Sequence, residues 1–390
     1  MVTLLYRVGS RYEVQGERGY AHLFEHLIFD GSKSLGRGEY DRLCTMAGGE
    51  NNAWTSVDLT GYWLALPCEQ LELGLWLEAD RMAGFGVTEE SLKRELSVIR
   101  AEKHQVVDNV PYGDVGGVIR ELLYPEGHPY RHEPIGSLDD LAGATVDRMQ
   151  SFFNRFYRPD NATLVVAGDM SHRRMEDLVR YHFEEIPAVA PPEPTDPPVV
   201  PLHSDVERRI DSEITPLPGA FLAWHAPELR NEDLKSLELL SMILADGDSS
   251  RLTLSLEYER QVASETGAWV EEGQGSSIFH IYAIAGSLET RPDELRSLLL
   301  AELRRVVVDG VTDRELEKVR NRKQSNLLAS LASISTRSER LAWYATIFDD
   351  PSLVWNEARE FESITPEQIV EAARGYLLEA PFASVLYHTL

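Results

Sequence analysis

Two stretches of the chain, far apart in sequence, share one pattern of apolar and polar positions. Residues 145–157 have the apolar spacing of an amphipathic helix, and a continuous apolar run at 162–167 follows them. The same pair, a helical pattern at 365–376 and an apolar run at 382–387, ends the chain. Both helical patterns begin at threonine, a favoured N-cap residue. The pattern predicts a helix followed by a strand in each half.

Two further correspondences extend the repeat. Long charged helices are predicted to begin at Thr88 and at Thr312. The segment HLFEHLIFDG at 22–31 aligns with ELLSMILADG at 238–247, and each is predicted to be an amphipathic helix stopped by its final glycine. Strands interleaved with helices in two similar halves predict an α+β fold. We expect two homologous, duplicated domains, each with a mainly antiparallel sheet and packed helices.

A proline-rich segment lies between the halves, at residues 187–198. So many prolines exclude a helix or a central strand and indicate a semi-rigid linker. We therefore predict domains at 1–190 and 206–390, joined by a linker at 191–205.

Composition restricts the classes of function. The formal net charge of −26 argues against nucleic-acid binding, which needs many lysines and arginines. No apolar stretch is long enough for a membrane span, and two separate cysteines do not indicate a disulfide framework. Residues 1–7 resemble a strand rather than a signal peptide. A cytoplasmic location is therefore expected, or a periplasmic one if residues that precede Met1 are missing.

The first copy of the repeated helix carries chemistry that the second lacks. His22 and His26 are four residues apart, so both imidazoles project from one face of a helix and can reach one metal ion. Glu25 lies beside them, and HxxEH is the inverse of the HExxH metallopeptidase motif. The alternative is two helical histidines with ordinary hydrogen bonds.

In the second copy the three positions hold other residues, namely Glu238, Ser241 and Met242. The scaffold alone therefore does not require two histidines and a glutamate.

A third ligand is expected on the helix that begins near Thr88. Glu95 and Glu102 are seven residues apart, two helical turns, and so share a face. The alternative is a charged surface helix, because several lysines and arginines accompany them. In the repeat, Val319 stands at the position of Glu95, which favours an inward-facing role for this position.

Five motifs together, HLFEH, GGENNAWTSVDLTGYW, RELSVIRAEKHQ, GHPYRHEPIG and FYRPDNATLVVAGDM, resemble the pitrilysin/insulinase family of zinc peptidases. The resemblance is closest to the short bacterial and mitochondrial-processing-peptidase-like members and covers nearly the whole chain. It implies an endopeptidase with one Zn²⁺ that cleaves peptides or small unfolded polypeptides.

The resemblance also implies the role of each site residue. In the family the third zinc ligand follows the second histidine by about 76 residues, which corresponds here to Glu102. It implies His22, His26 and Glu102 as zinc ligands, Glu25 as general base and Glu95 as a supporting carboxylate behind a ligand.

The segment around Asn52 is read from its residues alone as a turn that leads into a strand. The family resemblance implies a substrate-binding edge strand at Asn52, Ala53, Trp54 and Thr55. There an extended peptide would be held mainly by main-chain hydrogen bonds.

The chain departs from the family in its second half. Active members carry an arginine and a tyrosine there, seven residues apart, and the alignment places Glu257 and Ser264 at those positions. A glutamate repels a developing negative charge instead of stabilising it. We therefore expect a heterodimer, in which a homologous subunit supplies the arginine and tyrosine. A non-catalytic scaffold or assembly subunit of the same family is the alternative function.

Overall fold

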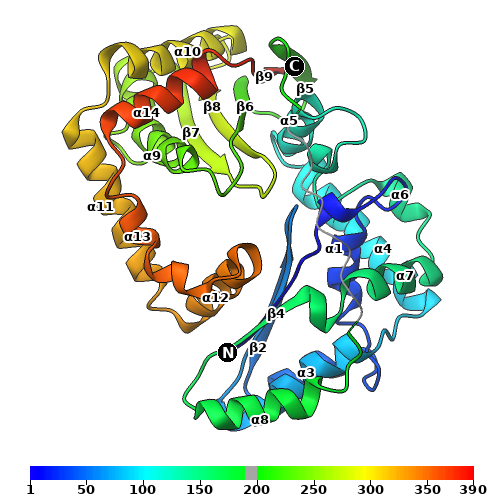
Figure 1. Cartoon of the computed structure of the whole chain (residues 1–390). Helices are drawn as coiled ribbons and strands as arrows, with labels where there is room; N and C mark the ends of the chain where they lie inside the picture. Colours follow the sequence, from blue (N-terminus) through cyan, green and yellow to red (C-terminus); the bar gives the residue numbers. More distant parts are fainter. Residues whose placement is uncertain (189–199) are drawn as a thin grey trace. The chain divides into compact units, whose positions relative to one another are not determined.

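The computed structural model describes residues 1–188 and 200–390 of the chain (Figure 1). They form two compact units. The first comprises Met1–Lys103, His132–Thr195 and Leu328–Asn356, and the second comprises His104–Arg131, Asp196–Leu327 and Glu357–Leu390. Most of the predicted linker at 191–205 lies outside the described residues, and the predicted domain boundaries on either side of it stay predictions.

The first unit contains a four-stranded antiparallel sheet in the order β2-β3-β1-β4. Its strands are β1 (Val2–Tyr6), β2 (Glu50–Thr55), β3 (Thr60–Ala65) and β4 (Ala162–Val166). Its helices are α1 (Tyr20–Leu27), α2 (Glu39–Met46), α3 (Leu71–Ala83), α4 (Glu89–Lys103), α6 (Leu138–Ala142), α7 (Val146–Phe156), α8 (His172–Phe183) and α12 (Ile334–Phe348). Leu4 on β1 lies opposite Tyr62 and Leu164, and buried side chains of α1 and α7 complete this part of the core.

The second unit contains a five-stranded sheet in the order β5-β9-β6-β8-β7. Its strands are β5 (Val206–Ser212), β6 (Gly219–Ala226), β7 (Ala263–Glu271), β8 (Ser277–Ala285) and β9 (Ala383–Thr389). Its helices are α5 (Val115–Leu123), α9 (Asp233–Ala245), α10 (Pro292–Asp309), α11 (Asp313–Ser330), α13 (Glu357–Glu360) and α14 (Pro366–Ala373). Leu222 and Trp224 of β6 are fully buried in a core with α9, α10 and α14.

The two sheets repeat one topology. The order β7-β8-β6-β9 in the second unit reproduces the order β2-β3-β1-β4 in the first, and every pairing in these series is antiparallel. Strand β5, which pairs in parallel with β9, is additional. The predicted α+β fold with two duplicated, mainly antiparallel halves is confirmed.

One helix in each unit comes from the other half of the sequence. Helix α5 follows α4 along the chain but packs on β6 and β9 of the second unit. Helix α12 follows α11 and packs on β1 and β4 of the first unit (Figure 1). Because α4 and α11 are the predicted counterparts in the repeat, the exchange is symmetrical.

Side-chain caps set the starts of several helices. The Thr145 side chain accepts a hydrogen bond from the Arg148 amide at the start of α7, and Thr365 forms a full capping box at the start of α14. The prediction of a glycine stop is wrong for Gly31, because α1 already ends at Leu27. None of the helices in the described residues has the length and apolarity that a bilayer span needs.

Candidate metal centre

Helix α1 presents two different sides. Leu23, Phe24 and Leu27 are fully buried and fix the helix in the core of the first unit. The other side carries His22, Glu25 and His26, which are all partly exposed. The helical spacing of the sequence thus places three polar groups on a rigid, well-packed element.

The start of α1 is held by a glutamate that the sequence did not reveal. The Glu13 carboxylate accepts hydrogen bonds from the backbone amides of Gly19 and Ala21, both at 2.8 Å. It also lies 2.9 Å from Nε2 of His132, which belongs to the GHPYRHEPIG motif. Amides at a helix start favour a carboxylate, so this pair fixes the position of α1. In the sequence, only the GHPYRHEPIG motif pointed to His132, and nothing pointed to its contact with Glu13.

Three side chains converge beside α1. Ligand atoms of His22, His26 and Glu102 all lie within 4.8 Å of one another. The two Nε2 atoms are 3.3 Å apart, Nε2 of His26 is 3.4 Å from one oxygen of Glu102, and Nε2 of His22 is 3.7 Å from the other. Glu102 reaches the histidines because α4 packs against α1.

These separations suit a tetrahedral zinc site. Nitrogen and oxygen ligands lie about 2.0–2.2 Å from zinc, so neighbouring ligands of a tetrahedron are about 3.4 Å apart. The separation of the two Nε2 atoms is close to that value, and each Nε2 lies within 3.7 Å of a different oxygen of Glu102. Two imidazoles with one carboxylate are a donor set typical of catalytic zinc. Burial and the neighbouring His26 lower the pKa of His22 to about 4, which keeps its imidazole neutral, as metal ligation requires. The residues present therefore fit the ion.

Glu25 lies next to these groups on the helix and is held by strand β2. The Thr55 hydroxyl donates a hydrogen bond of 2.5 Å to its carboxylate. Burial raises the pKa of Glu25, while the bond from Thr55 and the charge of His26 oppose that rise. A carboxyl group of raised pKa, held in a fixed position, is suited to accept and return a proton.

Glu95 lies behind His26. One of its oxygens is 3.7 Å from Nδ1 of His26, and the other accepts a hydrogen bond of 3.2 Å from Arg94. Arg94 also bonds Asp30, which follows α1. Through these contacts Glu95 and Arg94 of α4 connect this helix to His26 and to the turn after α1.

All four predicted substrate-binding residues, Asn52, Ala53, Trp54 and Thr55, lie on β2. Among the residues that the structure describes, this strand is at the edge of its sheet and pairs with β3 alone. Ala53 packs against the core of the unit, whereas the side chain of Thr55 is engaged by Glu25. The sequence indicated a turn before the strand, but the structure extends β2 back to Glu50.

The two positions that the sequence predicts to depart from the family lie in the second unit. Glu257 accepts a hydrogen bond of 2.6 Å from Thr266, and the Ser264 hydroxyl donates one of 2.9 Å to the Ala285 carbonyl. Both side chains are therefore engaged within their own unit, and neither carries the positive charge or the phenol of the family residues.

Comparisons with known proteins identify relatives of both halves of the chain. The sequence profile described as "Insulinase (Peptidase family M16)" matches residues 1–114, and the profile "Peptidase M16 inactive domain" matches residues 143–323. The chain is 28% identical over 392 residues to the zinc protease PqqE of Helicobacter pylori, covering 98% of this chain and 86% of that protein. It is 25% identical to the uncharacterized zinc protease YmxG of Bacillus subtilis, over 85% of this chain and 79% of the relative.

A solved structure shares the whole fold. The crystal structure of a protease from Helicobacter pylori superposes with a TM-score of 0.92 at 27% identity, covering 99% of this chain and 92% of that one. Profile matches in both halves, relatives of similar length and this superposition lead to one conclusion: the chain belongs to the pitrilysin/insulinase family, peptidase family M16, and resembles its short bacterial members.

Proposed function

We propose that the protein is a zinc-dependent endopeptidase that cleaves peptides or small unfolded polypeptides. The observation that carries the proposal is the convergence of His22, His26 and Glu102, whose ligand atoms all lie within 4.8 Å of one another and form a donor set typical of catalytic zinc. Relatives named zinc proteases support the same activity. One ion per chain follows from the one cluster of this kind in the described residues.

Each side chain of the site has a separate role in the proposed reaction. His22, His26 and Glu102 would hold the ion, which supplies Lewis-acid chemistry that activates water and polarises a carbonyl oxygen. Glu25 takes a proton from the attacking water and passes it to the leaving amine nitrogen. Thr55 fixes the carboxylate of Glu25 during both transfers, and Glu95 orients the imidazole of His26.

Strand β2 is the proposed binding site of the substrate. Its free edge offers main-chain donors and acceptors to an extended peptide, and Thr55 connects that strand to Glu25. Main-chain pairing would bring a scissile amide to the catalytic groups with little dependence on sequence.

A homologous partner is part of the proposal. Glu257 and Ser264 stand where the family carries its arginine and tyrosine, and both are engaged by neighbours in their own unit. The chain thus lacks two groups that would stabilise a developing oxyanion. We infer that a second family member supplies them and that the zinc-bearing chain acts as one subunit of a heterodimer. The compartment stays a prediction.

The test combines metal analysis with hydrolysis. The purified chain should retain about one zinc, and His22→Ala should lose it. An unstructured reporter peptide should be cleaved by the chain together with its partner, and a chelator should stop cleavage. Zinc binding without cleavage by any combination of family partners would favour the scaffold function instead.

A further inference from the structure

The tryptophan of the proposed substrate strand lies flat on its own sheet. Trp54 of β2 stands opposite Gly61 of β3 in the antiparallel ladder. A Cβ at Gly61 would lie 2.5 Å and 2.7 Å from two atoms of the Trp54 indole and 2.8 Å from the side chain of Leu5 on β1. The indole therefore extends inward across β3 toward β1, away from the open edge of β2.

A carboxylate of helix α12 binds the polar atom of this indole. Successive side chains of β2 point to opposite faces of the sheet, so Trp54 points away from the face on which Thr55 bonds Glu25. The indole N–H of Trp54 donates a hydrogen bond to the carboxylate of Glu339, which is only partly exposed. An indole N–H can only donate, and a partly buried one needs an acceptor, so this bond favours the inward position of the ring.

Helix α12 is itself fixed on this sheet. It packs on β1 and β4, and the Ser333 side chain caps its start. Near its end, the Thr346 carbonyl accepts a hydrogen bond of 2.8 Å from Arg7, which follows β1. Glu339 is thus presented to β2 from a rigid element, although α12 comes from the second half of the sequence.

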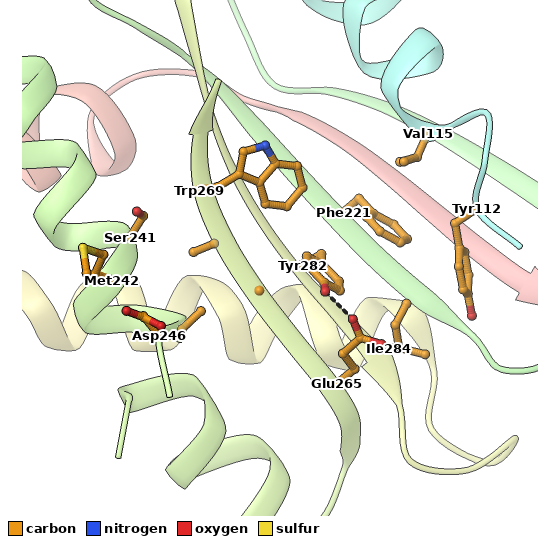
Figure 2. Close-up of a pocket in the computed structure, with 13 residues that line it drawn as sticks. Tyr112, Val115, Phe221, Ser241, Met242, Asp246, Glu265, Trp269, Tyr282 and Ile284 are labelled. Carbon is orange, nitrogen blue, oxygen red and sulfur yellow. Dashed lines mark hydrogen bonds between the residues drawn. The ribbon is translucent and has the colours of Figure 1, made fainter. Parts of the chain in front are cut away.

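The second unit holds the corresponding tryptophan differently (Figure 2). The sequence Gly-Ala-Trp-Val at 267–270 of β7 corresponds in the repeat to Asn-Ala-Trp-Thr at 52–55 of β2. Trp269 stands opposite a histidine, His280, and the two ring centroids are 4.5 Å apart in a stacked arrangement. With a ring beneath it, Trp269 is 42% exposed and borders a pocket of about 660 Å³, whereas Trp54 is less exposed. The comparison indicates that Gly61 is what allows the Trp54 indole to lie on its sheet.

We propose that Glu339 is a positioning residue of the proposed peptidase, which holds the Trp54 indole across Gly61 and so keeps the edge of β2 open for the substrate. Without this acceptor, rotation about the Cα–Cβ bond of Trp54 would let the ring turn toward the edge, where the backbone of an extended peptide must approach to about 4.8 Å. The inference rests on the proposed function and adds to it a residue from the second half of the sequence. It predicts that loss of Glu339 weakens peptide binding and raises KM, with little effect on kcat.

Binding is measured without turnover in the full-length Glu25→Gln protein, by the fluorescence anisotropy of a fluorescein-labelled, unstructured decapeptide. Glu339→Ala should raise the dissociation constant at least about fivefold, which is the size expected for the loss of one hydrogen bond. Glu339→Gln keeps an amide oxygen that can accept the bond and should restore most of the affinity. Glu69→Ala, at an exposed glutamate of the same unit, is the control and should bind the peptide as tightly as the parent protein.

Two further measurements separate positioning from a general loss of structure. In protein labelled with fluorotryptophan, Trp54→Phe assigns the fluorine NMR resonance of Trp54, and Glu339→Ala should shift that resonance and leave those of the other tryptophans in place. In the Trp54→Ala background, Glu339→Ala should cause no further loss of peptide affinity, because no indole is left to hold.

The possible results distinguish this inference from the proposed function. Unchanged peptide affinity in Glu339→Ala, or an equal loss of affinity with and without Trp54, overturns the inference even in a protein that cleaves peptides. In the complex with its partner, a fall in kcat without a rise in KM in Glu339→Ala also overturns it. A peptide affinity that depends on Glu339 in a protein that cleaves nothing would support the inference and count against the proposed peptidase activity.

Discussion

The repeated helices α1 and α9 have the same place in their units but different chemistry. Each buries leucines in its core and lies beside the edge strand of its sheet. His22, Glu25 and His26 of α1 correspond to Glu238, Ser241 and Met242 of α9. Because one scaffold accommodates both sets, packing does not dictate either set.

In the second unit, the side chains at the corresponding positions have protein partners. Glu238 of α9 pairs with Lys323 of α11 at 2.7 Å, and the Ser241 hydroxyl donates to a backbone carbonyl of its own helix. Val319, at the position of Glu95, is fully buried. The first unit instead gathers carboxylates around two imidazoles. An arrangement of that kind is costly unless a cation binds, which is why the difference points to function.

The largest effect should come from replacing Glu25. Glu25→Gln removes the proton acceptor but leaves the three ligand groups intact, so hydrolysis by the complex should fall by about 10²–10⁴. Zinc content should stay at the wild-type level. Glu90→Gln, an exposed change on α4, is the matched control and should be fully active. A Glu25→Gln protein that hydrolyses peptides at the wild-type rate would refute the role of Glu25.

The next effect concerns Glu257 and Ser264, which stand in the second unit where the family is expected to carry arginine and tyrosine. Loss of one oxyanion donor commonly costs about 10²–10³ in rate, so the chain alone should be nearly inactive and should gain activity with an arginine- and tyrosine-bearing partner. The double variant Glu257→Arg, Ser264→Tyr should recover part of that activity without the partner. Peptide cleavage is compared at equal zinc occupancy. Strong hydrolysis by the unpaired wild-type chain would show that neither residue matters.

A smaller effect is expected at Glu95. Glu95→Gln weakens the contact with Nδ1 of His26 but leaves the ligand set unchanged. Zinc affinity should fall by about 10–100-fold, as measured by competition with a chromophoric chelator. Glu89→Gln, an exposed change at the start of the same helix, should not alter the affinity. Equal affinities in all three proteins would make Glu95 an ordinary surface residue.

The sequence predicted what depends on short-range chemistry. Threonine N-caps located the starts of α7 and α14, and the four-residue spacing of His22 and His26 put both on one face of α1. The helix end at Leu27 was not predicted. Arg94 of another helix binds Asp30 in the turn that follows, a contact that the sequence does not reveal.

Long-range partners could not be predicted. The amphipathic pattern of α5 and α12 indicates that each helix has a buried side, but not which sheet it covers. The bond between Glu13 and His132 joins residues 119 positions apart, and no spacing rule predicts such a pair. The exchange of helices between the units and the support of α1 are therefore properties of the tertiary structure.

In the second unit, an ion pair of Glu238 and Lys323 involves the position that corresponds to the proposed zinc ligand His22, and this pair should contribute to stability. Lys323→Met leaves Glu238, whose side chain is 14% exposed, without its partner and should lower the free energy of unfolding by about 1–3 kcal/mol. The double variant Lys323→Met, Glu238→Gln should lose less of the free energy of unfolding than Lys323→Met alone. For the exposed pair of Arg180 and Glu176, Arg180→Ala should cost about 0.5 kcal/mol or less. Urea unfolding measures the free energy of unfolding of the wild type and the three variants. Equal losses of stability in Lys323→Met and Arg180→Ala would show that burial of the ion pair is irrelevant.

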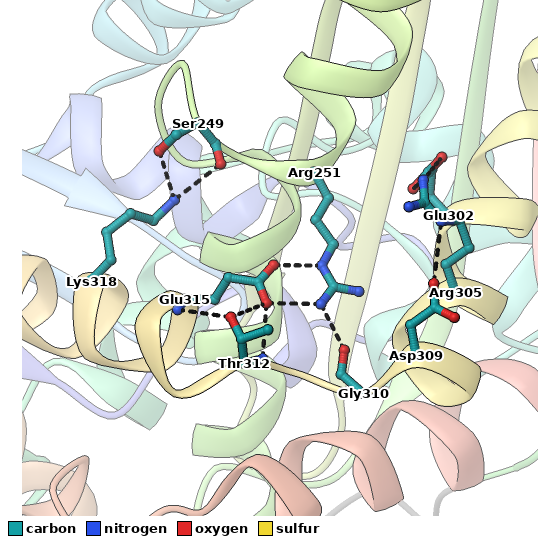
Figure 3. A network of polar contacts seen from close by, with 9 residues as sticks. All are labelled: Ser249, Arg251, Glu302, Arg305, Asp309, Gly310, Thr312, Glu315 and Lys318. Carbon is teal, nitrogen blue, oxygen red and sulfur yellow. Dashed lines mark hydrogen bonds and ion pairs between the residues drawn. The ribbon is translucent and has the colours of Figure 1, made fainter.

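A further difference between the units lies at the starts of α4 and α11. Thr88 and Ser91 exchange hydrogen bonds at the first, but at the second Glu315 takes the place of the serine and also bonds Arg251 (Figure 3). Burial raises the pKa of Glu315, but hydrogen bonds from Arg251 and Thr312 outweigh it and lower the pKa to about 2.

A carboxylate whose pKa is lower in the folded state stabilises the protein above its unfolded pKa of about 4.5, and this contribution is lost as the pH falls toward about 2. Glu315→Gln should therefore be less stable than wild type at pH 7, and the difference should narrow between pH 4.5 and pH 3. Ser91→Ala removes a hydroxyl that does not titrate, so its deficit should stay constant over the same range. Urea unfolding at several pH values measures both, and a deficit of Glu315→Gln that does not change with pH would mean that the bond to Arg251 does not stabilise the charged carboxylate.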